Sequence, residues 1–182
     1  MHRRLDERCR PNPMLGAAAG ALGGIAGSWA MIAFNHAIGA TENGERPQQH
    51  RRDAASPNEH DGTISDEPAT VQVAALAAES VTGRPPGERG KALGASMVHF
   101  LFGAAVGALY GAAVEYRRDT AALGGLPFGT AVWVAADEVG LPLAGLARDP
   151  ADYPAARHLA ALGSHLVYGL TAETVRRQLR GR

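Results

Sequence analysis

Four ionisable side chains lie inside stretches of sequence that otherwise carry almost no charge: His99, Asp137, Glu138 and His165. Imidazoles and carboxylates bind and release protons, and together they also suit a divalent cation. An ionisable group at the depth of a bilayer core is costly and usually faces the protein interior, so such residues are candidates for function. These residue types therefore predict a polar intramembrane cluster that handles protons or cations.

Simpler interpretations of the same residues stay open. An acid paired with an imidazole can merely satisfy buried polarity and fix how two helices pack. Metal binding is a weaker alternative, because the residues show no close ligand spacing. The sequence also contains no nucleophile elbow, phosphate-binding loop or HExxH motif. We predict no metal, no cofactor and no enzymatic activity, and rank a membrane enzyme third among the functions considered.

The elements that would position this cluster are four long apolar stretches, at residues 14–40, 93–114, 123–147 and 154–175. A helix needs about 20 apolar residues to cross the hydrocarbon core of a bilayer. The first two stretches carry no formal charge, and the third carries only Asp137 and Glu138. We therefore predict an all-α protein, a four-helix transmembrane bundle that forms a single membrane domain over residues 1–182.

Other classes of protein fit the sequence less well. A soluble bundle would show a polar helix face every 3.6 residues, and the first stretch shows none. A signal peptide has an apolar core of only about 7–15 residues. Lys plus Arg and Asp plus Glu number 18 each, so the charge balance predicts no nucleic-acid partner. The single cysteine, Cys9, excludes a disulfide within the chain.

Basic residues next to the apolar stretches predict the orientation in the membrane. They lie before the first stretch, after the second and after the fourth, and four crossings place these three segments on one side. That side is expected to be the cytoplasm, with both termini cytoplasmic and residues 41–92 outside. The residues concerned are Arg3, Arg4, Arg8, Arg10, Arg117, Arg118, Arg176, Arg177, Arg180 and Arg182.

The first loop has two parts. Residues 41–66 are polar and are predicted to be flexible. Residues 67–82 form an amphipathic pattern, with Ser65 or Asp66 as candidate N-caps, Pro68 in the first turn and Gly83 as a stop signal. This helix is too short to span a bilayer, so we expect it on the outer surface, against the bundle or the lipid headgroups.

Glycines recur every four residues on two of the predicted spans. Small residues let helix backbones approach closely in a membrane, where lipid removes the hydrophobic drive for association. The repeated spacing predicts helix-packing faces. Such faces either join the first two spans of one chain or pair the chain with a second copy or another membrane protein. The residues are Gly16, Gly20 and Gly24 in the first span and Gly103, Gly107 and Gly111 in the second.

The polar cluster is expected in the outer half of the bundle. At about 1.5 Å per residue, the alternating directions of the spans bring all four side chains to a similar height. Neighbouring residues point about 100° apart on a helix, so Asp137 and Glu138 should face different partners. Gly140 and Pro142 predict a kink or break in the third span. The two tryptophans, Trp29 and Trp133, are expected to be packing residues.

Several of these motifs resemble those of a known family, the YagU-like family of small bacterial inner-membrane proteins of unknown function. The resemblance runs from about residue 67 to residue 169. It implies a bacterial inner membrane and a loose link to acid tolerance, and it provides no catalytic residues. The motifs are His99-Phe100-Leu101-Phe102-Gly103, Gly107, Tyr110-Gly111, Ala136-Asp137-Glu138 with Pro142, and His165-Leu166-Val167-Tyr168-Gly169.

The function predicted from these observations is that of a multi-pass, non-enzymatic protein of the inner membrane. Its polar cluster would respond to or conduct protons or cations, with a link to envelope or acid stress. The alternative is a structural or assembly subunit of a membrane complex, held to its partner through the glycine faces.

Overall fold

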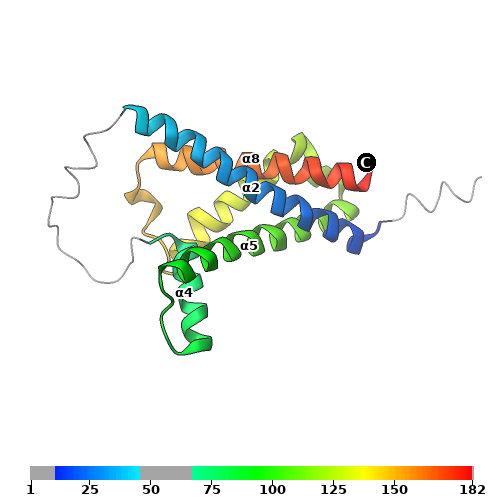
Figure 1. Ribbon diagram of the computed structural model, residues 1–182. Coiled ribbons are helices and arrows are strands. Elements are labelled where there is room, and N and C mark those ends of the chain that lie inside the picture. Colours follow the sequence, from blue (N-terminus) through cyan, green and yellow to red (C-terminus); the bar gives the residue numbers. More distant parts are fainter. Residues whose placement is uncertain (1–10, 46–66, 182) are drawn as a thin grey trace, which may run out of the picture.

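The computed structural model describes residues 11–45 and 67–181, and all regular elements in these ranges are helices (Figure 1). This confirms the predicted all-α class for the described part of the chain. The long helices are α2 (Pro13–Glu45), α4 (Ala69–Thr82), α5 (Glu88–Tyr116) and α8 (Ala155–Arg180). Shorter helices connect α5 to α8: η2 (Arg118–Gly125), α6 (Leu126–Trp133), η3 (Val134–Gly140), α7 (Leu141–Leu143) and η4 (Pro150–Asp152).

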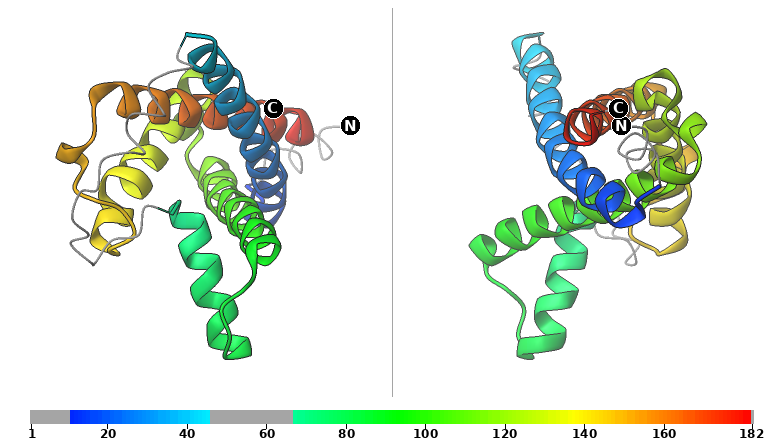
Figure 2. Two further views of the ribbon diagram at one scale, coloured as in Figure 1. Left: turned by 60° about the vertical axis from the view of Figure 1, so that its left-hand side comes forward. Right: turned by 90° about the vertical axis from the view of Figure 1, so that its right-hand side faces the viewer.

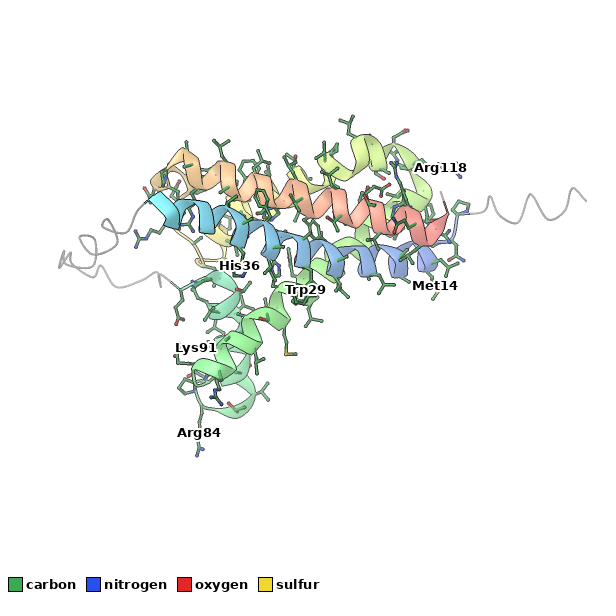
Figure 3. The ribbon with its side chains drawn as sticks, turned by 45° about the horizontal axis from the view of Figure 1, so that its top comes forward. Met14, Trp29, His36, Arg84, Lys91 and Arg118 are labelled. Carbon is green, nitrogen blue, oxygen red and sulfur yellow. The ribbon has the colours of Figure 1, made fainter. Side chains whose placement is uncertain are left out.

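Helix α2 packs against both α5 and α8 and runs antiparallel to each (Figures 1 and 2). Helix α6 packs against α8, also in the antiparallel sense, because Gly125 lies at Gly169 and Gly129 lies at His165. The beginning of α2 and the end of α8 therefore lie at the same end of the bundle. Figure 3 shows Met14 and Arg118 at that end, which we call the base, and His36 towards the opposite end.

The contact between α2 and α5 is made by glycines. A Cβ atom built on Gly20 would overlap the carbonyl oxygen of Gly107, and one built on Gly24 would overlap that of Gly103. A Cβ on Gly16 would lie 2.5 Å from the carbonyl oxygen of Gly111. At this separation of the two backbones only glycine fits. The two glycine faces predicted from the sequence thus meet each other within one chain.

Small and polar residues lie inside the bundle, whereas many large apolar residues lie outside. The buried polar residues are Ser28, Glu115, Ser164, His165, Glu173 and Arg176. On α5 the exposed face carries Leu93, Met97, Leu101, Phe102 and Leu109. Trp29 packs beside the ring of Phe100, but it is 63% exposed, so this contact lies on the outside of the bundle.

Two helices of the described ranges are long and apolar enough to cross a membrane, Pro13–Gly39 and Glu88–Tyr116. The other two predicted spans do not meet this test, so a four-span bundle is not confirmed. The third is interrupted, because Leu123 and Gly124 have positive φ angles before α6 and the regular helix ends at Leu143. The fourth is the continuous helix α8, whose polar and charged residues lower its mean hydropathy.

The first loop differs in part from the prediction. Helix α2 continues to Glu45, so residues 41–45 are helical and not a flexible loop. Residues 1–10, 46–66 and 182 lie outside the described ranges. They include Cys9 and the candidate caps Ser65 and Asp66. Pro68 occupies the N-cap position of α4 without a side-chain hydrogen bond.

Helix α4 itself and its stop signal are as predicted. Gly83 takes the left-handed conformation, with φ 68°, and its N–H donates to Glu79 O. The helix packs on the first turns of α5, where Ala74 lies against Gly94, and it runs across the direction of α8 (Figure 2). Arg84 lies at the tip of the arm that α4 and α5 form (Figure 3).

Candidate functional site

The two adjacent acids of the predicted cluster lie on η3, a π-helical segment. The Leu141 N–H donates to Ala136 O, five residues back, which widens the turn. Pro142 has no N–H to give to the carbonyl of Glu138, so an ordinary α-helical hydrogen bond cannot form there. Single π-helical turns inside α-helices are frequent at functional sites. The break predicted from Gly140 and Pro142 is therefore present as this wider turn.

Glu138 pairs with His158, on the first turn of α8. The distance from Glu138 Oε1 to His158 Nδ1 is 2.7 Å, and the other ring nitrogen, Nε2, lies 3.0 Å from Pro150 O. The side chains of His158 and Glu138 are 27% and 20% exposed. His158 was not among the four residues of the cluster predicted from the sequence.

Asp137 faces a different imidazole, that of His165, as the angle between neighbouring residues predicts. Asp137 Oδ2 lies 3.7 Å from His165 Nδ1, which is too long for a hydrogen bond. The same Nδ1 is 2.9 Å from Ala161 O, so its N–H donates to that carbonyl. The contact between Asp137 and His165 is therefore electrostatic and without a shared proton.

The structure does not bring His99 to the two acids. His99 Nε2 lies 3.4 Å from Ser28 O on α2, and its ring meets Phe100 edge-on. His99 is therefore part of the contact between α2 and α5. In residues 11–45 and 67–181, no three His, Cys, Asp or Glu residues gather where they could hold a metal ion.

A pocket of about 140 Å³ opens beside both acids. Its lining includes Arg157, His158 and Tyr153 together with Asp137 and Glu138. The guanidinium of Arg157 lies over the Tyr153 ring, 3.7 Å from its centroid. A cavity of this size with several polar groups can hold water molecules. Water in the pocket would give protons a route to the Glu138–His158 pair.

A second charged group, which sequence reasoning missed, lies near the base of the bundle. Glu173 is 1% exposed and accepts a hydrogen bond from the Tyr110 hydroxyl at 2.9 Å. Arg176 donates to both of its oxygens, at 2.6 and 2.8 Å, and Arg177 donates to one of them. The hydrogen bonds to Glu173 raise the pKa of Arg176 above its ordinary value, so it stays charged. We call Tyr110, Glu173, Arg176 and Arg177 the base cluster.

Glu115 forms a third charged contact, at the end of α5. Its two oxygens accept hydrogen bonds from Arg180 at 2.8 and 3.0 Å, and Oε2 also accepts from the Asn12 N–H at 2.9 Å. These bonds tie the beginning of α2 to the ends of α5 and α8. Glu173 could have been noticed, because it precedes Arg176 and Arg177 by three and four residues on one helix. Glu115 and Arg180 are 65 residues apart and give no local signal.

Comparison with known families gives one match within this region. Residues 88–174 match a family described as Protein of unknown function (DUF1440). The matched segment runs from the first residue of α5 into α8 and contains both acid–imidazole pairs and Glu173. The family is uncharacterised, and the match does not confirm the resemblance to the YagU-like family. Comparison with curated proteins gave no match, and comparison with solved structures gave none.

Proposed function

We propose that this chain is an integral membrane protein that crosses the bilayer four times and binds protons at its outer end. The observation that carries the membrane assignment is that α5 buries small and polar residues and exposes large apolar ones, the opposite of a helix in a soluble protein. Its buried positions include Gly103, Gly107 and Glu115, whereas Leu93 and Leu109 are 69% and 74% exposed. Soluble monomers rarely expose apolar patches of more than a few hundred Å². Lipid, by contrast, favours large apolar residues outside and small residues at helix contacts.

The interrupted third stretch and α8 are assigned to the same membrane. Both expose large apolar side chains, namely Val134, Val139, Leu143, Leu159 and Leu170. Irregular backbone at membrane depth is tolerated where it is buried in protein or lines a water-filled cavity. The acids of both segments, Asp137, Glu138 and Glu173, have charged or imidazole partners within the bundle, which lowers the cost of placing them there. The resemblance suggests that this membrane is a bacterial inner membrane.

The proton-binding part of the proposal rests on the two acid–imidazole pairs. Glu138–His158 and Asp137–His165 lie on the π-helical turn and on α8, and both acids line the same pocket. Imidazoles and carboxylates bind and release protons, so the two pairs are the candidate proton-binding groups. A role in acid or envelope stress is supported only by the resemblance.

The alternative, a structural or assembly subunit, is less well supported. Its partner was expected on the glycine faces, but Gly20 and Gly24 are occupied by Gly107 and Gly103 of the same chain. A partner chain would therefore need another surface.

Orientation can be tested by labelling single cysteines in a Cys9→Ser background. We expect a membrane-impermeant maleimide to modify Ser80→Cys, on the exposed face of α4, in intact spheroplasts. Asp119→Cys, in the exposed turn after α5, should react only after the membrane is opened. The reverse pattern would place the acid–imidazole pairs at the cytoplasmic end. Extraction of the protein by alkaline carbonate would overturn the membrane assignment itself.

Proton conduction can be tested with the purified protein in liposomes that enclose a pH-sensitive dye. We expect an imposed acid gradient to drive proton entry in the wild type, because the pairs and the pocket offer a polar route. The Asp137→Asn, Glu138→Gln double variant should be no faster than protein-free liposomes. Asp152→Asn, at an exposed acid outside the pocket, is the matched control. A wild type as slow as protein-free liposomes would exclude conduction, and a stably co-purifying subunit would then support the alternative.

A further inference from the structure

The hydrogen-bond partners of His158 determine how its ring nitrogens are protonated. Pro150 O can only accept a hydrogen bond, so the Nε2 that lies 3.0 Å from it must carry a hydrogen. The second ring nitrogen, Nδ1, lies 2.7 Å from Glu138 Oε1. This distance requires a hydrogen between the two atoms, because two bare acceptors would repel each other.

Only two arrangements satisfy both contacts. In the first, His158 is an imidazolium that donates from Nδ1 to an ionised Glu138. In the second, a neutral His158 accepts at Nδ1 from a protonated Glu138. Both arrangements contain the same number of protons, one between the two side chains. A neutral imidazole beside an ionised carboxylate has only one ring hydrogen and can satisfy only one of the two contacts.

We propose that Glu138 and His158 form a binding site for one proton, and that this proton lets the start of α8 bind η3 and Pro150 at the same time. This deepens the proposed function, since it assigns the ligand of the same site. The pair also holds Pro150, in the segment that links η3 to α8, so it closes that end of the pocket. Loss of the proton leaves one ring hydrogen for two acceptors, so His158 loses its contact with either Glu138 or Pro150 O.

Charged and titratable groups from each neighbouring segment face this pair. Asp137 lines the same pocket from η3, and its charge favours the protonated pair. Arg157, also in the pocket lining and next to His158 on α8, opposes protonation. Tyr153 contributes its ring, which meets His158 edge-on with centroids 6.5 Å apart. The two side chains are partly exposed, so protons can reach the pair from the solvent on that side.

The sign of the pH dependence follows from the protons bound in each state. Between about pH 4.5 and 6.5 the unfolded chain carries one proton on these two groups, as the folded pair does. In that window the contact contributes its full stability. As the pH rises, the unfolded chain loses this proton first, and the stability declines until the folded pair has lost it as well. The thermal midpoint of the wild type in detergent should therefore fall towards alkaline pH.

The substitution Glu138→Gln tests the proposal sharply. The glutamine amide can donate an N–H to Nδ1 of a neutral imidazole, while Nε2 still donates to Pro150 O. The variant should fold and should lose the part of the pH dependence that the wild type shows above about pH 6.5. Glu138→Ala should have a low thermal midpoint at every pH, because it removes the partner. His36→Gln, at an exposed imidazole on α2, is the control and should retain the wild-type profile.

Nitrogen-15 NMR of the histidine rings gives a second, independent measurement. At pH 6 we expect His158 to show either two protonated nitrogens or an Nε2–H tautomer whose Nδ1 accepts a hydrogen bond from a protonated Glu138. A neutral His158 of either tautomer beside an ionised Glu138 at pH 6, or an unchanged pH profile in Glu138→Gln, would overturn the proposal. Both measurements use detergent-solubilised protein, so they do not depend on conduction. If liposomes show no proton flux but both measurements give the expected results, proton conduction is excluded and the proton-binding site at Glu138 and His158 is retained.

Discussion

Glu173→Ala is expected to lower the free energy of unfolding by about 3–5 kcal/mol, because it leaves a buried charge without its partner. Arg176 is only 4% exposed, and both of its hydrogen bonds to this carboxylate would be lost. The Tyr110 hydroxyl would lose its acceptor as well. Neither group can move into solvent without disturbing the contact between α5 and α8. Denaturation of the purified protein in detergent measures the change.

The control for this substitution is the next residue on the same helix. Thr174 is exposed, and its hydroxyl donates only to Leu170 O of its own helix. Thr174→Ala should therefore change the free energy of unfolding by no more than about 0.5 kcal/mol. Equal losses in the two variants would mean that Glu173 does not hold the base cluster together.

The sequence predicted those parts of the fold that depend on local patterns. Apolar length located α2 and α5, and Gly83 located the end of α4. Glycines spaced by four lie on one helix face, so their spacing predicted two packing faces, and the structure shows that these faces join α2 and α5. The backbone between Tyr116 and α6 was not predictable. Leu123 takes a positive φ angle there, a conformation that the sequence predicts only for glycine.

The sequence predicted the two acids and His165 as neighbours, whereas the structure separates His99 from them and adds His158. Residue counting along each span predicted the level of His99, but its direction was not drawn from its place four residues before Gly103, on the glycine face of α5. The rotation of α5 about its axis is set by the glycine contact with α2, which turns His99 towards Ser28 O. His158 became the partner of Glu138 through the π-helical turn and the position of Pro150, which are features of the folded chain.

The arginines at the end of α8 form ion pairs within the bundle, which the sequence composition did not indicate. Counting them as orientation signals treats each as a free positive charge. Arg176, Arg177 and Arg180 are instead bound to Glu173 and Glu115. Part of the positive charge on that flank is thereby neutralised, so the predicted orientation depends more strongly on the basic residues before the first span and on Arg117 and Arg118 after α5.

Gly107→Leu is expected to be the most damaging substitution in the contact between α2 and α5. The first added carbon alone would overlap the Gly20 carbonyl oxygen and lie 2.9 Å from Gly24 Cα and 3.0 Å from its N. These are backbone atoms of a long helix, so no side chain can rotate away, and the two helices must separate along their length. Overpacking a well-fitted contact costs about 1–3 kcal/mol and occasionally more, and we expect the upper part of this range or beyond.

Ala105→Leu is the control, because Ala105 lies on the exposed face of the same helix and the larger side chain would enter lipid or detergent. The yield of monodisperse protein and its thermal midpoint in detergent measure the difference. Equal values for the two variants would show that close approach of the glycine faces does not hold α2 to α5.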